Sequence, residues 1–247
     1  NDATEKWRKI ADVCVWAFFD KDKSKLRLEE RQRREDIVRA WLDGNEGAAL
    51  RVDRWVKDIR ELHAPFHWWI EFPEEFIEER PDPLSHRSVN GVAYLDGVVG
   101  NPPFLGGKKI STMFGSAYGN WISQIPVSNK NSDLSVYFFR RSAELIGHHG
   151  AFGLISTNTI SQGDTRKMGL QVLLENNWSI YDSIRSLPWP GAAVVTVTIV
   201  HLARGLVSKN TKKCLDGREV EIINSHLRPK IERPDPKPLS INRKFSY

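Results

Sequence analysis

Asp96-Gly97-Val98-Val99-Gly100-Asn101-Pro102-Pro103-Phe104 is the stretch of sequence that decides the fold of this chain. The apolar run at residues 94–99 is too short for a helix and predicts a buried strand. The two prolines that follow fix the backbone angle φ and remove two backbone donors, so the strand must end before them. We therefore expect the Asn101 side chain at the carboxyl end of a strand, the edge of an open α/β sheet at which ligands bind.

The tetrapeptide at residues 101–104 suits the methylation of an exocyclic amine, whose lone pair is delocalised into a ring. The Asn101 side-chain oxygen and the Pro102 carbonyl can each accept one amino hydrogen, which frees the lone pair to face a methyl donor about 3 Å away. Phe104 offers a flat face on which the target ring can stack. This chemistry needs no general base with a shifted pKa, and none stands in the motif.

These residues also resemble a known family. Asn101-Pro102-Pro103-Phe104 is similar to the catalytic tetrapeptide of S-adenosylmethionine-dependent amino methyltransferases, in the version with Phe that is usual for adenine-N6 DNA enzymes. The likeness covers about residues 63 to 247 and points to large bacterial methyltransferases of restriction-modification and phage-defence systems, including single-chain type II enzymes. It is carried by Phe66-His67-Trp68 through Phe72-Pro73-Glu74, by Val98 through Lys109, and by Leu154 through Arg166.

The resemblance implies an α/β fold: the carboxyl half of a Rossmann-like class I methyltransferase sheet, with an N-terminal helical segment and a truncated C-terminal extension. It also implies S-adenosylmethionine as the cofactor. The family binds this donor on a glycine-rich turn after its first strand, and no such turn occurs upstream of Asn101. We therefore expect the donor site to lie before Asn1, and the 247-residue chain to be inactive and to bind the donor weakly on its own.

The family supplies the second aromatic wall of its base pocket from a hairpin near the end of the sheet. Trp189 is the matching residue here, in the stiff turn Leu187-Pro188-Trp189-Pro190-Gly191. The alternative is a tryptophan that anchors the core beside two prolines. Lys108 and Lys109 follow the tetrapeptide in a glycine-containing stretch that we expect to be a flexible loop, with the lysines either contacting DNA phosphates or simply solvated.

Composition limits the class of protein. The chain has 247 residues and 40% hydrophobic content, enough for one large domain or for a domain with appendages. It has no apolar run of 18 residues and no signal peptide, so we expect a cytoplasmic protein without membrane contact. Cys14 and Cys214 lie far apart, and the adjacent side chains of His148 and His149 diverge, so we expect neither a disulfide nor a metal site.

Three regions are expected along the chain. Residues 1–62 form a helical scaffold with three helices, and residues 63–205 form the catalytic half of the methyltransferase domain. Residues 206–247 contain ten Lys or Arg against five Asp or Glu and carry the net charge of +5. This basic stretch reads either as a phosphate-contacting linker into a target-recognition domain or as ordinary solvated surface.

Within the catalytic half, we expect an extended aromatic segment at residues 66–76 that packs beside a central strand at 94–99. Residues 118–121 are expected to be mobile. A helix at 134–145 should end in a turn at 147–150. Strands are expected at 151–156, 179–184 and 192–202, with a helix capped by Asp164 at 165–176.

The leading hypothesis is therefore a DNA adenine methyltransferase whose target base rotates out of double-stranded DNA. Its donor-binding half and its target-recognition domain would belong to the same polypeptide. Two alternatives remain open at this point. One is an amino methyltransferase for RNA adenine or protein glutamine, and the other is a non-catalytic DNA-binding or assembly module of a larger complex.

Overall fold

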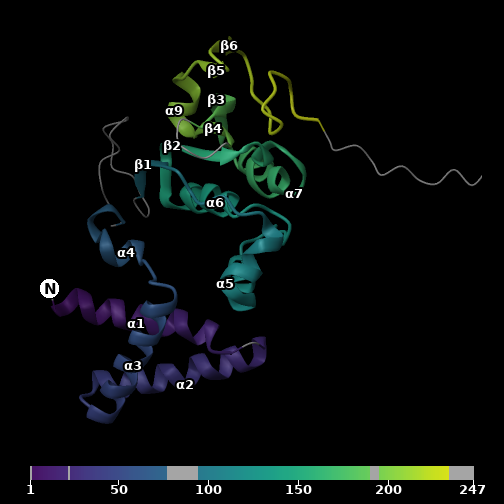
Figure 1. Ribbon diagram of the computed structural model, residues 1–247. Helices are drawn as coiled ribbons and strands as arrows, with labels where there is room; N and C mark the ends of the chain where they lie inside the picture. Colours follow the sequence, from purple (N-terminus) through teal and green to yellow (C-terminus); the bar gives the residue numbers. More distant parts are fainter. Residues whose placement is uncertain (1, 22, 77–93, 190–194, 234–247) are drawn as a thin grey trace, which may run out of the picture.

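The computed structural model describes residues 2–21, 23–76, 94–189 and 195–233. A mixed six-stranded sheet with helices lies at one end of the molecule, and three N-terminal helices lie at the other (Figure 1). The fold is therefore of the α/β class, as the sequence predicts, with an added helical segment.

The strands are β1 (Leu95–Gly100), β2 (Ile146–Thr157), β3 (Ser179–Pro188), β4 (Thr196–Ala203), β5 (Lys213–Leu215) and β6 (Arg218–Val220). The helices are α1 (Asp2–Phe19), α2 (Ser24–Leu42), α3 (Glu46–Leu62), α4 (Trp68–Glu71), α5 (Gly107–Ile122), α6 (Ser135–Leu145), α7 (Gly163–Arg166), α8 (Val172–Glu175) and α9 (Gly205–Asn210). Short 3₁₀ turns are η1 (Pro73–Glu75) and η2 (Asn158–Ser161), and a π-helical turn, η3 (Lys167–Gln171), joins α7 to α8.

The strand order is β1-β2-β4-β3-β5-β6. β1 runs parallel to β2, whereas β4 lies between β2 and β3 and is antiparallel to both. The long apolar run that predicts a paired strand is thus interior, although residues 192–194 of that prediction lie outside the described part of the chain. Since β1, β2 and β3 point the same way, their carboxyl ends share one edge of the sheet.

One face of the sheet is covered by α6 and by the helical stretch 163–175 (Figure 1). Phe139 of α6 packs edge-on against Phe152 of β2, with ring centroids 6.0 Å apart, and Trp178 packs against the same Phe152 at 5.0 Å. The alternation of buried and half-buried residues along β4 follows from the period of two in a strand. The most deeply buried residues of this core include Val136, Phe139, Ile146, Ile160, Leu170, Ile180, Val200 and Leu202.

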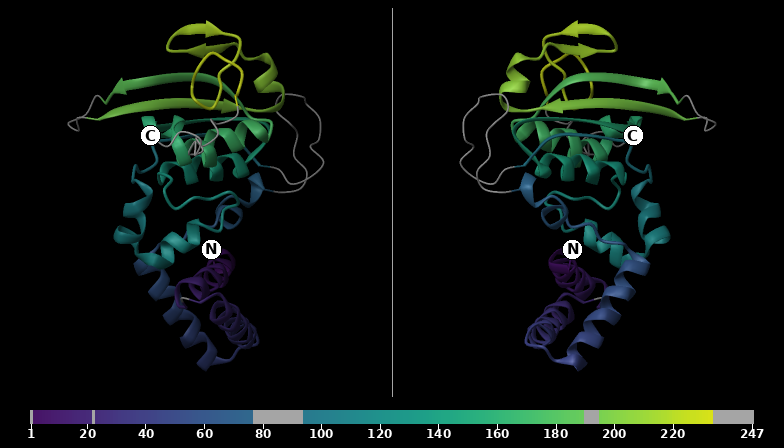
Figure 2. Two further views of the ribbon diagram at one scale, coloured as in Figure 1. Left: turned by 90° about the vertical axis from the view of Figure 1, so that its right-hand side faces the viewer. Right: turned by 90° about the vertical axis from the view of Figure 1, so that its left-hand side faces the viewer.

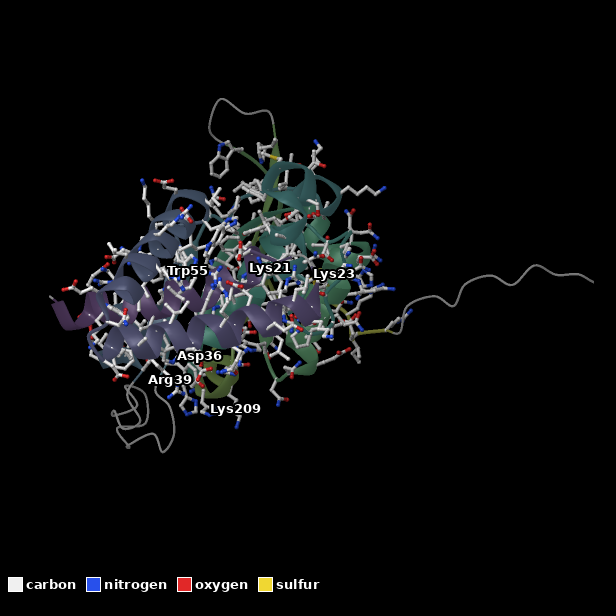
Figure 3. The ribbon with its side chains drawn as sticks, turned by 90° about the horizontal axis from the view of Figure 1, so that it is seen from below. Lys21, Lys23, Asp36, Arg39, Trp55 and Lys209 are labelled. Atoms are coloured by element: carbon white, nitrogen blue, oxygen red, sulfur yellow. The ribbon has the colours of Figure 1, made fainter. Side chains whose placement is uncertain are left out.

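The three helices expected over residues 4–62 are present. Their small core contains Val13, Val52 and Val56. Trp55 of α3 lies on the other side of α2 from Asp36 and Arg39 (Figure 3). Together α1, α2 and α3 form what we call the helical segment.

Aromatic rings join the helical segment to the rest of the molecule. Phe18 and Phe19 at the end of α1 contact Trp121 of α5, with ring centroids 5.0 and 5.5 Å apart. His63 stacks on Tyr118 of the same helix at 6.1 Å. Residues 118–121, expected to be mobile, are therefore helical and packed.

The expectation of an extended segment at residues 66–76 is wrong, because α4 and η1 occupy it. The alternation of Phe66, Trp68 and Ile70 suggested a strand, but Trp68 contacts Phe66 and Phe72 within a compact turn, at 5.0 and 6.0 Å. The Arg8–Glu71 ion pair and the Asp12–His67 hydrogen bond, both from α1, hold this turn. Local ring packing and these charges override the two-residue period.

The expected flexible loop at residues 105–109 is also wrong, because α5 begins at Gly107 and has a non-helical break at Gly115. A side chain on Gly107 would come 2.3 Å from the Lys130 carbonyl, so glycine is needed for close packing rather than for mobility. Likewise, residues 147–150 are not a turn, because β2 starts at Ile146 directly after α6.

Two further expectations need correction. β1 is an edge strand of the described sheet rather than a central one, and its Val99 is 93% exposed. Asp164 does not precede the following helix as a cap, because α7 begins one residue earlier, at Gly163.

In the described ranges, no helix has the length and apolar character needed to span a membrane.

Candidate active site

The tetrapeptide at residues 101–104, which we call the proline corner, follows β1 directly. Asn101 is exposed, whereas Pro102 is buried beneath it. Pro103 is exposed and Phe104 is half-buried. A buried, rigid proline thus anchors a corner that leaves its asparagine side chain open to solvent.

Backbone contacts hold the proline corner against the loop before α6. The Leu134 N–H donates to the Leu105 carbonyl at 2.8 Å. Gly107 lies against the backbone of residues 130–132 so closely that a side chain would not fit. These two contacts fix the chain on the carboxyl side of the corner.

The start of α6 is tied in turn to β2. The Asp133 carboxylate, two residues before α6, accepts a hydrogen bond from the Ser135 N–H at 2.9 Å. The Asp133 N–H donates to the Thr165 hydroxyl at 3.0 Å. The Ser135 and Ser156 hydroxyls, both buried, are hydrogen-bonded at 2.8 Å. The proline corner is therefore connected to the end of β2 through buried polar contacts.

Three stretches lie at the carboxyl edge of the sheet, and we call them the rim: residues 101–104, 157–159 and 186–189. Gly100 pairs with Leu154 of β2, so the corner and residues 157–159 leave the sheet on the same side. The free end of the β3–β4 pair and helix α5 also lie on this side (Figure 2). Ligands of open α/β sheets bind at such an edge.

Trp189 stands at the free end of the β3–β4 pair. Its N–H donates to the Val195 carbonyl at 3.0 Å, and the preceding Pro188 pairs with Thr196. The residue is half-buried, whereas Trp178 fills the buried core. Its neighbours Pro190 and Gly191, which define the predicted stiff turn, lie outside the described residues.

Lys108 and Lys109 are exposed in the first turn of α5, immediately after the proline corner. They are the positive charges of the chain closest in sequence to Asn101. A helix start beside the rim holds them more firmly than the loop expected from the sequence.

Asn158 is a residue of the rim to which the sequence assigns no role. Its side chain is hydrogen-bonded to hydroxyls of β3 and β4. The signal that could have found it is the polar triplet Thr157-Asn158-Thr159 directly after an apolar strand.

On the far side of the rim, Arg185 fixes β3 to the β5–β6 turn. Its Nη2 and Nε donate to the Asp216 carboxylate at 2.6 and 2.9 Å, and its N–H donates at 2.8 Å. Burial would raise the pKa of Asp216, but these bonds from Arg185 outweigh it and lower the pKa.

Within the described ranges, no group of three His, Cys, Asp or Glu residues could hold a metal ion.

Comparisons with known proteins point to one family. The family model described as the DNA-methyltransferase domain of MmeI matches residues 66–215. A search of curated proteins gave no match. Among solved structures, the type IIL restriction-modification enzyme MmeI in complex with DNA matches at 21% identity and a TM-score of 0.42, over 56% of this chain and 20% of that one. The chain thus spans about a fifth of that protein.

Proposed function

We propose, on the premise that this chain belongs to the family of the MmeI DNA-methyltransferase domain, that it methylates the N6 amino group of a flipped-out adenine in DNA. The methyl donor would be S-adenosylmethionine, and the setting would be a restriction-modification or phage-defence enzyme. The observation that carries the proposal is the open Asn101 on its buried Pro102 at the carboxyl edge of the sheet.

Asn101 and Pro102 would hold the amine. The Asn101 side-chain oxygen and the Pro102 carbonyl each accept one amino hydrogen, which draws the nitrogen lone pair out of conjugation with the ring. The same two oxygens hold the protons of the methylated amine until one proton leaves to water. Pro103 keeps the corner stiff, so little reorganisation is needed during transfer.

Phe104 and Trp189 would form the two walls of the base pocket. Rotating an adenine out of the duplex costs a few kcal/mol. Stacking on one aromatic ring contributes about 1–3 kcal/mol per base and so offsets part of this cost. Lys108 and Lys109 would contact the backbone phosphates of double-stranded DNA beside the flipped base.

S-adenosylmethionine supplies an electrophilic methyl group when bound. The described residues before β1 form α1 to α4 and η1, and they contain no strand followed by a glycine-rich turn of the kind that cradles such a cofactor. These described residues before β1 therefore do not fit the donor, and we assign none of them to its binding.

We interpret the order β1-β2-β4-β3 as the carboxyl half of a Rossmann-like sheet. Within the described ranges, β1 is the terminal strand of the sheet, and its Val99 is 93% exposed. We propose that the donor-binding half adds to the sheet at this edge. A target-recognition domain reached through residues 206–247 would complete the enzyme.

The nature of the acceptor tests the proposal. The complete polypeptide is incubated with isotopically labelled S-adenosylmethionine and with duplex DNA, RNA or glutamine-containing peptides in parallel. Mass spectrometry of the digested products should find the label in N6-methyldeoxyadenosine. Label in RNA, in peptide or in a methylated cytosine would contradict the proposed substrate, and DNA binding without any transfer would favour the non-catalytic alternative.

A further inference from the structure

Asn158 lies one residue beyond the end of β2 and connects three elements of the rim. Its Nδ2 donates to the Ser186 hydroxyl of β3 at 3.1 Å and to the Thr196 hydroxyl of β4 at 3.4 Å. Its Oδ1 accepts from the Thr198 hydroxyl of β4 at 2.6 Å. A planar amide with two donor hydrogens and an acceptor oxygen suits these three hydroxyls.

The backbone at Ser186 is strained. Its φ is +52°, in the left-handed region that side chains other than glycine disfavour. The register between β3 and β4 shifts in the same place, between Ile184 and Leu187. Strained residues of this kind persist only when their surroundings hold them, and Asn158 contacts this one directly.

The irregular stretch around Ser186 controls where the end of β3 points. A bulge bends its strand and turns the residues beyond it, and bulges are common beside active sites. Trp189 is three residues further on, and Thr196 pairs with the Pro188 that precedes it. Asn158 is thus hydrogen-bonded to both strands of the β3–β4 pair, close to the end of β3 that precedes Trp189.

The proline corner is fixed to the same strand that carries Asn158. Ser156, two residues before Asn158, bonds to Ser135 of the helix whose preceding residue Leu134 holds Leu105. One strand end therefore sets the positions of both proposed walls of the base pocket. A change in the Asn158 contacts would move one wall and leave the other in place.

We propose that Asn158 is a positioning residue that sets the distance and tilt of Trp189 relative to Phe104 and thereby orients the flipped adenine for transfer. This inference rests on the proposed function. Asn158 acts through Ser186, Thr196 and Thr198 and does not itself touch the amine. Because Asn158 is partly exposed, water can replace its hydrogen bonds, so its loss loosens the pocket without unfolding the protein.

The test compares Asn158→Ala with Thr211→Ala in the complete polypeptide. Thr211, like Asn158, is partly exposed, but it follows α9 outside the rim, and its hydroxyl donates to the Val207 carbonyl at 2.7 Å. Duplex DNA carries 2-aminopurine at the methylated adenine, so that its fluorescence reports stacking of the flipped base. Steady-state kinetics on unmodified DNA give kcat and KM separately.

For Asn158→Ala we expect kcat to fall about 10- to 100-fold, because misplacement of a reactant by about 1 Å costs about 100-fold. KM for DNA and the thermal midpoint should stay near those of the unchanged protein, and 2-aminopurine emission should rise as the base stacks less well. Thr211→Ala should behave as the unchanged protein does.

Equal kcat and emission for Asn158→Ala and Thr211→Ala would overturn the inference, as would a fall in kcat that only follows a loss of folded protein. A Ser186→Gly variant is a second test. It relieves the backbone strain and removes one Asn158 contact, so it should also lower kcat. Failure of the proposed function looks different, because the unchanged protein would then form no methylated adenine.

Discussion

The helical segment is stabilised by contacts between charged groups, whereas the rim is stabilised by contacts between neutral groups. In the helical segment, Arg34 is 2% exposed and bonds to the carboxylates of Glu30 and Asp20, at 2.7 and 2.9 Å. Asp12 is 1% exposed and bonds to Arg60 and His67, both at 2.7 Å. In the rim, the side-chain hydrogen bonds run between hydroxyls and the Asn158 amide.

The contacts of the two regions therefore differ in how they depend on pH. Buried ion pairs hold helices in one register but make their stability depend on pH. An amine acceptor held by neutral oxygens keeps its hydrogen bonds whatever the pH. The helical segment also holds α4 by charge: the Nε and Nη2 of Arg8 donate to the two carboxylate oxygens of Glu71, at 2.6 and 2.7 Å, and so fix α4 to α1.

Among substitutions that affect only one of the two regions, a substitution of Glu30 in the helical segment should have the largest effect, on the free energy of unfolding. Burial would raise the pKa of its carboxyl, but hydrogen bonds from Arg33 and Arg34 outweigh burial and lower the pKa to about 2. A carboxyl with a lowered pKa stabilises the folded state above its unfolded value of about 4.5, and this contribution is lost as the pH falls through about 2. At neutral pH it amounts to about 3 kcal/mol.

Glu30→Gln should therefore lower the free energy of unfolding at pH 7 by about that amount. The difference between the two proteins should shrink as the pH falls from 4.5 to 2, which urea unfolding at several pH values would measure. Methyl transfer per folded molecule should not change, because Glu30 is remote from the rim. A stability difference that is constant over this pH range would contradict the assignment of the charged pair.

A smaller effect, confined to the rim, should follow from Trp189→Ala. Stacking on one base contributes about 1–3 kcal/mol, so we expect about a tenfold or greater loss in kcat/KM for DNA. The free energy of unfolding should hardly change, because Trp189 is half-buried at the end of the β3–β4 pair. Trp189→Phe keeps a flat ring and should restore most of the loss. A large loss of stability would instead support the core-anchoring role.

Much of the fold follows from local patterns in the sequence. The apolar run after Gly150 and the helical spacing in residues 4–62 predict elements that the structure contains. The proline corner sits at the carboxyl end of a strand because two prolines leave the chain no alternative. These predictions hold because each depends on contacts within a short stretch of chain.

The failures have a common physical cause, which is contact between distant residues. The turn at 66–76 is fixed by Arg8, 63 residues away from Glu71. Gly107 is packed against Lys130, and nothing in the stretch 105–109 reveals that. The three hydroxyls that bind Asn158 come from β3 and β4, 28 to 40 residues further along the chain. A polar triplet after a strand indicates the location of a site but not its hydrogen bonds.

The most direct test of the central claim is the rate of methyl transfer by Asn101→Ala in the complete polypeptide, measured in a single turnover beside S-adenosylmethionine binding by calorimetry. The proline corner predicts that transfer to adenine falls by about 10³-fold or more while donor affinity is unchanged, because the lost oxygen acts only on the amine. Transfer within a few fold of the unchanged protein would show that Asn101 does not hold the amine and would contradict the account.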